Sequence, residues 1–287
     1  MPHGLPALRD IALVDLSVPI SASTAEPEPP RIDYVDHRRS AAELARAANA
    51  LARTAARPAA AERRVEPSSF RDGLGLANEN LILDTHAGTH LDAPWHFGPE
   101  CENKPARTID RVPLEWCLAP GVVLDLRFKK AGETISPADL QAALERIAYR
   151  LRPGDIVLLM TGADKHFDQQ DYFVAHAGMG REATLWLLDQ GIKIIGIDGW
   201  GFDRHAHAML DDFFAGHPDA LFPAHMVGRE REYCHIEKMA NLDRIPVPYG
   251  FWVACFPVKV ERGSAGWVRA VAMINKEDCH DRARTQH

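Results

Sequence analysis

The chain has 287 residues, of which 46% are hydrophobic and 25% charged, as in an ordinary folded globular protein. Its 33 basic and 40 acidic residues give a net charge of −7, which argues against nucleic acid or an anionic membrane as the main partner. The chain starts without the basic and apolar segments of a secretory signal, and no apolar run is long enough to span a membrane. We therefore expect a cytoplasmic protein that acts on a small molecule.

The cysteines and histidines differ in what they suggest. The five cysteines are scattered and include no CxxC pair, so they indicate neither a disulfide framework nor a cysteine zinc site. We expect reduced thiols. The 14 histidines are unusual and are the first place to look for chemistry.

The N-terminal part predicts a strand followed by an excursion. Residues 11–20 (IALVDLSVPI) have the pattern of a strand, and the Pro- and Glu-rich residues 21–31 then interrupt regular structure. Residues 40–56 are alanine-rich and predict a helix.

This excursion contributes little to a core. Large apolar side chains are almost absent between Val35 and Phe70. We therefore interpret residues 21–75 as a lid or a subunit-interface insertion, rather than as an independent domain, within a single domain spanning residues 1–287.

From residue 79 onward, predicted strands and helices alternate. Strands are predicted at residues 79–85, 121–128, 155–160, 192–198, 250–258 and 267–274, and helices at 136–153 and 181–190. Ser136, Pro137 and Asp139 form a capping pattern at the first helix, and Gly191 ends the second. The alternation predicts an α/β fold built as a single compact mixed-sheet domain, with the helical N-terminal excursion attached.

The most informative segment is HAGTHLDAPWHF, residues 86–97. It places His86, His90, Asp92 and His96 within eleven positions, directly after a predicted strand. Imidazole nitrogens and carboxylate oxygens together suit Zn²⁺ or Mn²⁺, and the absence of nearby cysteine disfavours a closed structural zinc site. An open, catalytic metal site is the better interpretation.

The segment must bend if its histidines are to share an ion. In an extended strand His86 and His90 would lie about 13 Å apart. Gly88 permits unusual backbone angles, so we expect a local helical turn that Pro94 then stops.

Two other interpretations were weighed against a metal site. A histidine-rich loop with satisfied hydrogen bonds is the ordinary role of a single histidine, but it does not explain four ligand-type side chains in one short segment. GMGREA, residues 178–183, loosely matches a dinucleotide-binding fingerprint, yet the residues before it do not resemble a strand end. We interpret its glycines as the turn before a helix.

The motif also resembles a known family. HAGTHLDAPWHF is similar to the HxGTHxDxPxH(F) signature of the metal-dependent cyclase family, which includes bacterial kynurenine formamidases and isatin hydrolases. DLSVPI near the N-terminus, IIGIDGWGFD (194–203) and residues 224–245 resemble further segments of that family. The resemblance covers about residues 11–20 and 80–275, and it implies the cyclase/kynurenine formamidase type of fold.

The resemblance implies a set of metal ligands. His86, His90 and Asp92 match the ligands of a first divalent ion, and Asp92 would be shared with a second. His225 and Glu237, twelve positions apart, match the distal ligands. The expected cofactor is thus one or two Zn²⁺ or Mn²⁺ ions per chain.

The resemblance also implies a catalytic acid/base, His96, held outside the metal's coordination shell. Its expected reaction is hydrolysis of an amide, cyclic amide or lactone by a metal-activated water. By residue type alone, Glu230, Glu232 and His235 compete with Glu237 as ligands, and only Glu237 stands in the Glu-Lys-Met-Ala-Asn-Leu context.

The substrate stays open at this stage. Aromatic and histidine side chains near the motifs are candidates for substrate contacts, although core packing explains each equally well. These candidates are Trp95, Phe97, His176 and Trp200. The excursion at 21–75 and the long segment at 204–222 depart from the small formamidases. A lactone hydrolase, a cyclase or dehydratase, and a non-catalytic metal-binding protein remain alternatives, and we expect a homo-oligomer, either a dimer or a tetramer.

Overall fold

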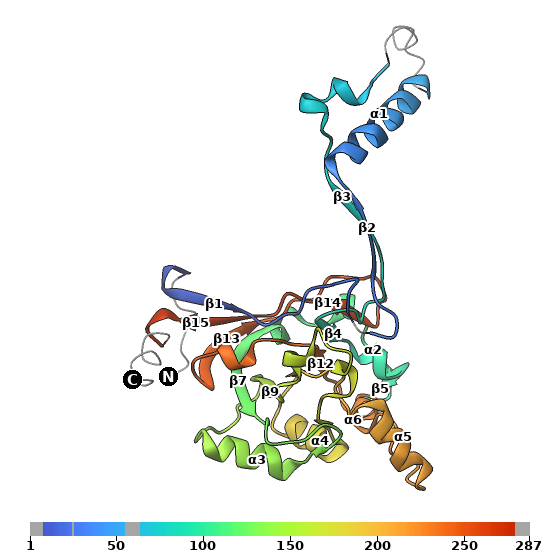
Figure 1. The fold of residues 1–287 in the computed structure, drawn as a ribbon. Helices are drawn as coiled ribbons and strands as arrows, with labels where there is room; N and C mark the ends of the chain where they lie inside the picture. Colours follow the sequence, from blue (N-terminus) through green and yellow to red (C-terminus); the bar gives the residue numbers. More distant parts are fainter. Residues whose placement is uncertain (1–7, 25, 55–63, 279–287) are drawn as a thin grey trace. The chain divides into compact units, whose positions relative to one another are not determined.

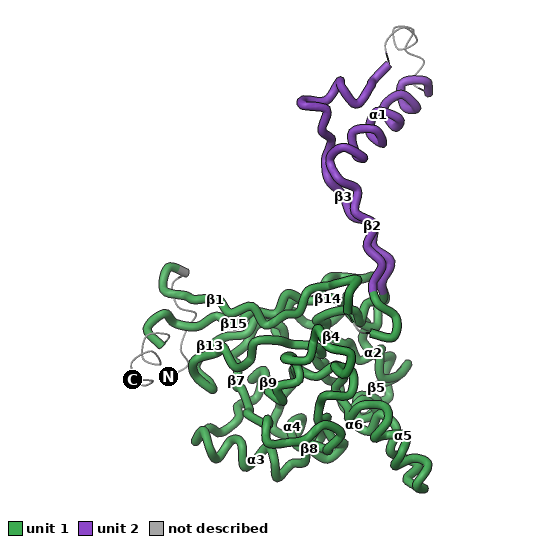
Figure 2. Tube along the Cα trace, in the orientation of Figure 1, with its two compact units in different colours: residues 1–29, 84–287 green, residues 30–83 purple. Residues whose placement is uncertain are grey.

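The computed structural model describes residues 8–24, 26–54 and 64–278, and it divides the chain into two units. Unit 1 comprises residues 1–29 and 84–287, and unit 2 comprises residues 30–83 (Figure 2). Unit 2 begins and ends eight to nine residues later than the excursion expected at 21–75. The end of the helix predicted at 40–56 lies outside the described residues.

Unit 1 is built on one mixed sheet, as predicted (Figure 1). Its nine strands follow the order β1-β15-β13-β7-β9-β11-β12-β4-β14. Their bounds are β1 Ile11–Asp15, β4 His90–Asp92, β7 Leu118–Asp125, β9 Ile156–Met160, β11 Ile194–Ile197, β12 Cys234–Glu237, β13 Tyr249–Ala254, β14 Ala265–Trp267 and β15 Val271–Asn275. The central strands β7, β9, β11 and β12 are parallel, and the pairs on either side are antiparallel.

The helices of unit 1 begin where the sequence places caps. In α3 (Pro137–Arg146) the Ser136 side chain accepts a hydrogen bond from the Asp139 amide, and the Asp139 carboxylate accepts one from the Ser136 amide. This capping box confirms the predicted start. The predicted end at residue 153 is wrong, because the chain leaves the helix at Ile147 and Ala148 takes a positive φ of 50°.

The second predicted helix is α4 (Arg181–Asp189), and Gly191 follows it with a φ of +83°. A side chain at Gly191 would also collide with Pro153, so a glycine is required there. The remaining helices of unit 1 are α2 (Pro94–Phe97), α5 (Ala206–Phe214) and α6 (Pro223–Val227). Short strand pairs are formed by β5 (Glu100–Cys101) with β6 (Lys104–Pro105) and by β8 (Thr134–Ile135) with β10 (Gly178–Met179).

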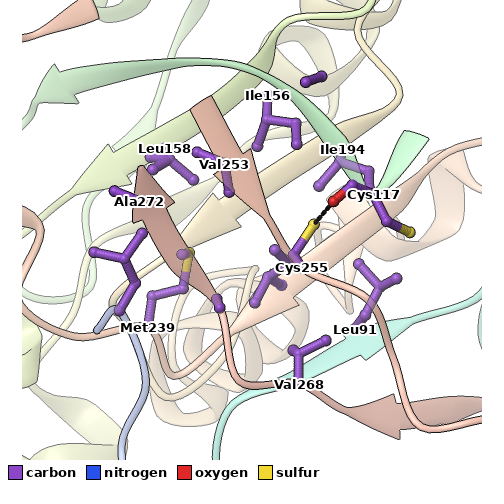
Figure 3. Packing of buried hydrophobic residues seen from close by; sticks show 14 of the residues in the cluster. Leu91, Cys117, Ile156, Leu158, Ile194, Met239, Val253, Cys255, Val268 and Ala272 are labelled. Atoms are coloured by element: carbon purple, nitrogen blue, oxygen red, sulfur yellow. Dashed lines mark hydrogen bonds between the residues drawn. The ribbon is translucent and has the colours of Figure 1, made fainter. Parts of the chain in front are cut away.

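Both faces of the sheet are buried, because β9 alternates between two apolar clusters. Ile156 and Leu158 join one cluster, whereas Val157 and Leu159 join the other, which packs against α3 and α4. Figure 3 shows the first cluster, which also contains buried thiols. The cysteines within the described residues are all free and buried, in agreement with the expected reduced thiols; they are Cys101, Cys117, Cys234 and Cys255. Cys279 lies outside the described residues.

Unit 2 consists of a two-stranded ribbon and a helix. The strands β2 (Arg31–Val35) and β3 (Asn78–Ile82) pair antiparallel, with Arg31 opposite Ile82, and α1 spans His37–Thr54. A strand does form within the predicted residues 79–85, as β3, but it pairs with β2 in unit 2 and does not begin the α/β part of the chain. The buried side chains of α1 are small, which agrees with the prediction that this segment adds little to a core.

Among the helices of the described residues, none is both long enough and apolar enough to cross a membrane.

Candidate active site

Two neighbouring strands place four polar side chains together. His90 and Asp92 lie two residues apart on β4, and His235 and Glu237 lie two residues apart on β12, so each pair shares one face of its strand. The antiparallel register sets His235 opposite Asp92 and Glu237 opposite His90. All four residues are buried. The sheet thus creates a compact block of two imidazoles and two carboxylates.

The segments that flank β4 add two histidines. His86 lies in the turn before the strand, and its Nδ1 is 2.9 Å from Oδ1 of Asp92. His96 lies in α2, and its Nε2 is 3.6 Å from Oδ2 of Asp92. The predicted helical turn between His86 and His90 is wrong: Gly88 takes a positive φ of 60°, and the chain then becomes extended. Pro94 does not stop a helix either, since it is the first residue of α2.

A third segment supplies His225 from α6. Its Nε2 is 3.5 Å from Oε1 of Glu237 and 3.9 Å from Oδ2 of Asp92. His235 lies closer to both carboxylates, with its Nε2 at 3.0 Å from Asp92 and 3.2 Å from Glu237. His90 Nε2 is 3.3 Å from Asp92 and 3.6 Å from Glu237. Ring nitrogens from five histidines thus converge on Asp92.

The geometry contains two sets of side chains whose ligand atoms lie within 4.8 Å of one another. One set is Asp92, His225, His235 and Glu237, and the other is His86, Asp92 and His96. Asp92 belongs to both sets. The arrangement has the form expected for two neighbouring cation positions that share one carboxylate.

Four of the histidines that point one ring nitrogen at the carboxylates, His86, His90, His225 and His235, have the other nitrogen in a hydrogen bond. Nδ1 of His90 donates to the Gly88 carbonyl at 2.8 Å, and Nδ1 of His235 lies 3.4 Å from the Tyr233 hydroxyl. For His86 it is Nε2 that contacts the Ser264 hydroxyl, at 3.2 Å. Such outer contacts fix which nitrogen is free to bind a metal.

Several inward-facing atoms lack a hydrogen-bond partner among the described residues. They are Nε2 of His90, Nε2 of His235 and both carboxylate oxygens of Asp92. Buried polar atoms without partners are costly, and nitrogen and carboxylate oxygen are the ligands that Zn²⁺ and related ions take. The residues present therefore fit a divalent metal.

Both carboxyl groups are anionic at neutral pH. Burial by itself raises the pKa of Asp92, but the neighbouring imidazoles outweigh burial and hold the pKa well below its usual range. The pKa of Glu237 is lowered in the same way, mainly by His235, against the opposing effect of burial. Two anions among five imidazoles give this site the charge that favours a cation.

The predicted substrate contacts do not all reach the surface. Trp95 is 43% exposed and stands beside His96. Phe97 is only 2% exposed, stacks on Tyr233 and contacts the rings of His225 and His235, so its place is in the core rather than in a substrate pocket. Trp200 is half-buried, with the Lys238 ammonium 5.1 Å from its ring centre.

Two residues of the site are not assigned by the sequence. His235 competes with Glu237 by residue type and ranks below it, yet the structure brings both residues to Asp92. The two residues are two positions apart on a buried strand, and this spacing in the sequence could have indicated that their side chains share a face. Asp203, which contacts His225, gives no such signal, because its partner lies 22 residues further along the chain.

His176 is buried, and its Nε2 donates a hydrogen bond to the Asp203 carbonyl, 3.2 Å away; burial lowers the pKa of His176 to about 4. Below pH 6.5 the unfolded chain takes up a proton that the folded chain does not, so stability falls as the pH drops from about 6.5 towards 4. We expect the buried, neutral His176 to lower the free energy of unfolding by about 2 kcal/mol when the pH falls from 7.5 to 5. Urea unfolding at both pH values should show that His176→Gln loses less stability on acidification than the wild type does. Equal losses of stability would show that His176 is not the cause.

Comparison with known proteins found a matching family model and similar proteins. The Cyclase family model, described as "Putative cyclase", matches residues 14–204, a range that includes the 86–97 motif and ends before His225. The isatin hydrolase of Roseibium aggregatum is 29% identical over 216 residues, which cover 71% of this chain and 78% of that protein.

Two solved structures share the fold. An isatin hydrolase bound to the product analogue thioisatinate has a TM-score of 0.70 and 20% identity, covering 93% of this chain and 94% of the other. Isatin hydrolase A from Ralstonia solanacearum has a TM-score of 0.69 and 22% identity, covering 93% of each chain. Because the family model matches more than half of the sequence, including the motif that builds the polar block on β4, the chain belongs to the Cyclase family.

Proposed function

We propose that the protein is a metal-dependent hydrolase that cleaves the carbon–nitrogen bond of an amide or cyclic amide. The observation that carries this proposal is the fully buried carboxylate of Asp92, on which ring nitrogens from five histidines converge. The proposed ligands are His86, His90, Asp92, His225, His235 and Glu237, with His96 outside the coordination shell, and the proposed ion is Zn²⁺ or Mn²⁺, one or two per chain. When bound, such an ion supplies a Lewis acid that polarises a carbonyl and lowers the pKa of a water molecule.

His96 is the side chain best placed to move a proton. It is partly exposed and contacts the cluster only at its edge, and burial, the main cause, lowers its pKa to about 4. The ring is therefore neutral at pH 7 and can accept a proton. In the proposed reaction His96 takes a proton from the water that adds to the carbonyl carbon, and then gives it to the nitrogen that leaves.

The substrate class is proposed from the relatives and from the rim of the site. The similar proteins include isatin hydrolases, and isatin is an aromatic cyclic amide. Trp95, which directly precedes His96 in α2, exposes a flat apolar ring, and such a surface suits an aromatic substrate. We extend the proposal to the half-buried Trp200 as a residue that borders the substrate, whereas His176, expected there from the sequence, is 1% exposed and belongs to the interior.

A metal-reconstitution assay tests this function. The purified protein should bind Zn²⁺ or Mn²⁺ and hydrolyse isatin, an N-aryl formamide or a lactone of similar size, and a chelator should abolish the activity. If the protein hydrolyses only one of these compounds, that compound identifies the leaving group. A protein that binds metal and hydrolyses none of these compounds would be a metal-binding protein without this activity.

We also propose a cytoplasmic homo-oligomer. The buried free thiols suit a reducing compartment, and unit 2 exposes several large apolar side chains, including Leu51, Leu76 and Ile82. Light scattering on the purified protein measures the oligomeric state directly.

Unit 2 is proposed to act on substrate choice or subunit contact rather than on chemistry. Because Arg31 pairs with Ile82, the ends of unit 2 lie side by side, and a short linker can replace residues 30–83. We expect this variant to fold and to bind metal as the wild type does, since the proposed ligands all belong to unit 1. Metal analysis, light scattering and kcat/KM on two substrates are the measurements; a folded variant that binds no metal would contradict the prediction.

A further inference from the structure

Asp203 lies just beyond β11 and makes three hydrogen bonds to one short helix. Its carboxylate is 2% exposed. Oδ1 accepts from the Ala224 amide at 2.7 Å, and Oδ2 accepts both from the His225 amide at 3.1 Å and from Nδ1 of the His225 ring. Both oxygens are therefore used as acceptors, and one of them is used by a residue of the metal cluster.

These contacts decide where the proton of the His225 ring resides. A carboxylate can only accept, so the ring nitrogen that faces it must carry hydrogen. Nδ1 of a neutral His225 is then protonated, and Nε2 keeps its lone pair. Nε2 is the atom that lies 3.5 Å from Glu237 and 3.9 Å from Asp92, on the side where a metal ion would bind.

The segment that carries Asp203 is itself held firmly. Near its end the Phe202 amide donates to Glu237 at 2.8 Å. A side chain at Gly178 would come within 2.0–2.3 Å of the Asp203 main chain, so only glycine allows this close approach. Asp203 is thus placed before any ligand arrives.

We propose that Asp203 is a positioning residue that selects the Nδ1–H tautomer of His225 and so presents Nε2 as a metal ligand. The proposal rests on the proposed function in one respect, namely that the cluster binds a metal. It differs from a purely structural role, in which Asp203 would serve only to cap α6. A cap would affect helix stability but would leave the ring tautomer unchanged.

The test compares Asp203→Asn with a matched control, Asp198→Asn. Both changes replace a buried carboxylate that accepts backbone amides, but only Asp203 contacts a ring of the cluster. In Asp203→Asn, an amide NH₂ facing Nδ1 would favour the Nε2–H tautomer, as in the aspartate-to-asparagine change of a serine-protease triad. We expect Asp203→Asn to bind Zn²⁺ about 10–100-fold more weakly by calorimetry, and Asp198→Asn to keep the wild-type affinity.

Imidazole ¹⁵N NMR on the metal-free protein supplies the second readout, with His225→Gln used only to assign the signal. Wild type and Asp198→Asn should show Nδ1–H for His225, and Asp203→Asn should show Nε2–H. The proposal is overturned if metal-free wild type carries the His225 proton on Nε2, a result that does not depend on Asp203→Asn. Unchanged Zn²⁺ affinity in a folded Asp203→Asn protein overturns it as well. If wild type binds no Zn²⁺, the proposed function fails, while the tautomer comparison still decides the role of Asp203.

Discussion

Replacing Asp92 with asparagine is expected to prevent binding of divalent ions at both ligand sets and to abolish hydrolysis. Asp92 is the residue that the two sets share, and both of its oxygens face ring nitrogens. Asparagine has the same shape but carries no charge and only one acceptor oxygen, so the set of His86 and His96 loses its anionic ligand and the other set keeps only Glu237. The loss of affinity should exceed the about 10–100-fold that changes outside the coordination shell produce. Metal analysis after incubation with Zn²⁺ and Mn²⁺, followed by gel filtration, measures it.

Asp155→Asn is the matched control for this experiment. Asp155 is also a buried aspartate, but it accepts hydrogen bonds from Tyr149 and from the Arg152 amide, remote from the histidines. This variant should keep its metal. If Asp92→Asn is folded and keeps two ions per chain, Asp92 does not bridge them and the two-ion arrangement is wrong.

The sequence predicts half of the site because that half is local. His86, His90, Asp92 and His96 lie on one segment, so their density reveals a metal site without knowledge of the fold. The way the segment bends is not predicted correctly. The bend was expected to come from a helical turn, whereas the structure uses a turn, a strand and a short helix in succession. Sequence density reports which residues gather, but the backbone path depends on the neighbouring strand.

His235 shows what the sequence leaves open. A histidine and a glutamate two residues apart share a face if the segment is a strand, but not if it is a helix or loop. Only the pairing of β12 with β4 puts that face against Asp92. Sheet register is set by contacts between segments more than 140 residues apart, and no local pattern specifies it.

The elements of the fold also differ in whether a local sequence pattern can predict them. The start of α3 was predicted correctly because a capping box is complete within four residues, Ser136 to Asp139. The strand predicted at 79–85 was assigned to the main sheet, and it pairs instead with β2 in unit 2. Apolar content identifies a strand, but the partner of that strand depends on the rest of the chain.

His96→Ala is expected to keep the metal and to lower turnover by about 10²–10⁴-fold, because it removes a proton acceptor without removing a required ligand. The ring is 32% exposed, and its Nε2 lies further from Asp92 than the nitrogens of His86 and His235 do. Burial lowers the pKa of His96 to about 4, so its ring is neutral at pH 7 and its nitrogen is not already protonated. Metal content and kcat, measured on the same preparation, separate the two roles.

His166→Ala is the matched control, since His166 is a partly exposed histidine that contacts Asp171 rather than the cluster. It should retain both metal and activity. The alternative is that His96 is a metal ligand, since it also lies in the set of His86 and Asp92, and the metal content of the variant distinguishes the two roles. If His96→Ala loses one ion together with its activity, His96 is a ligand, and the proton must then be moved by another residue near the site. A variant that keeps both its metal and its full turnover would exclude His96 from the chemistry altogether.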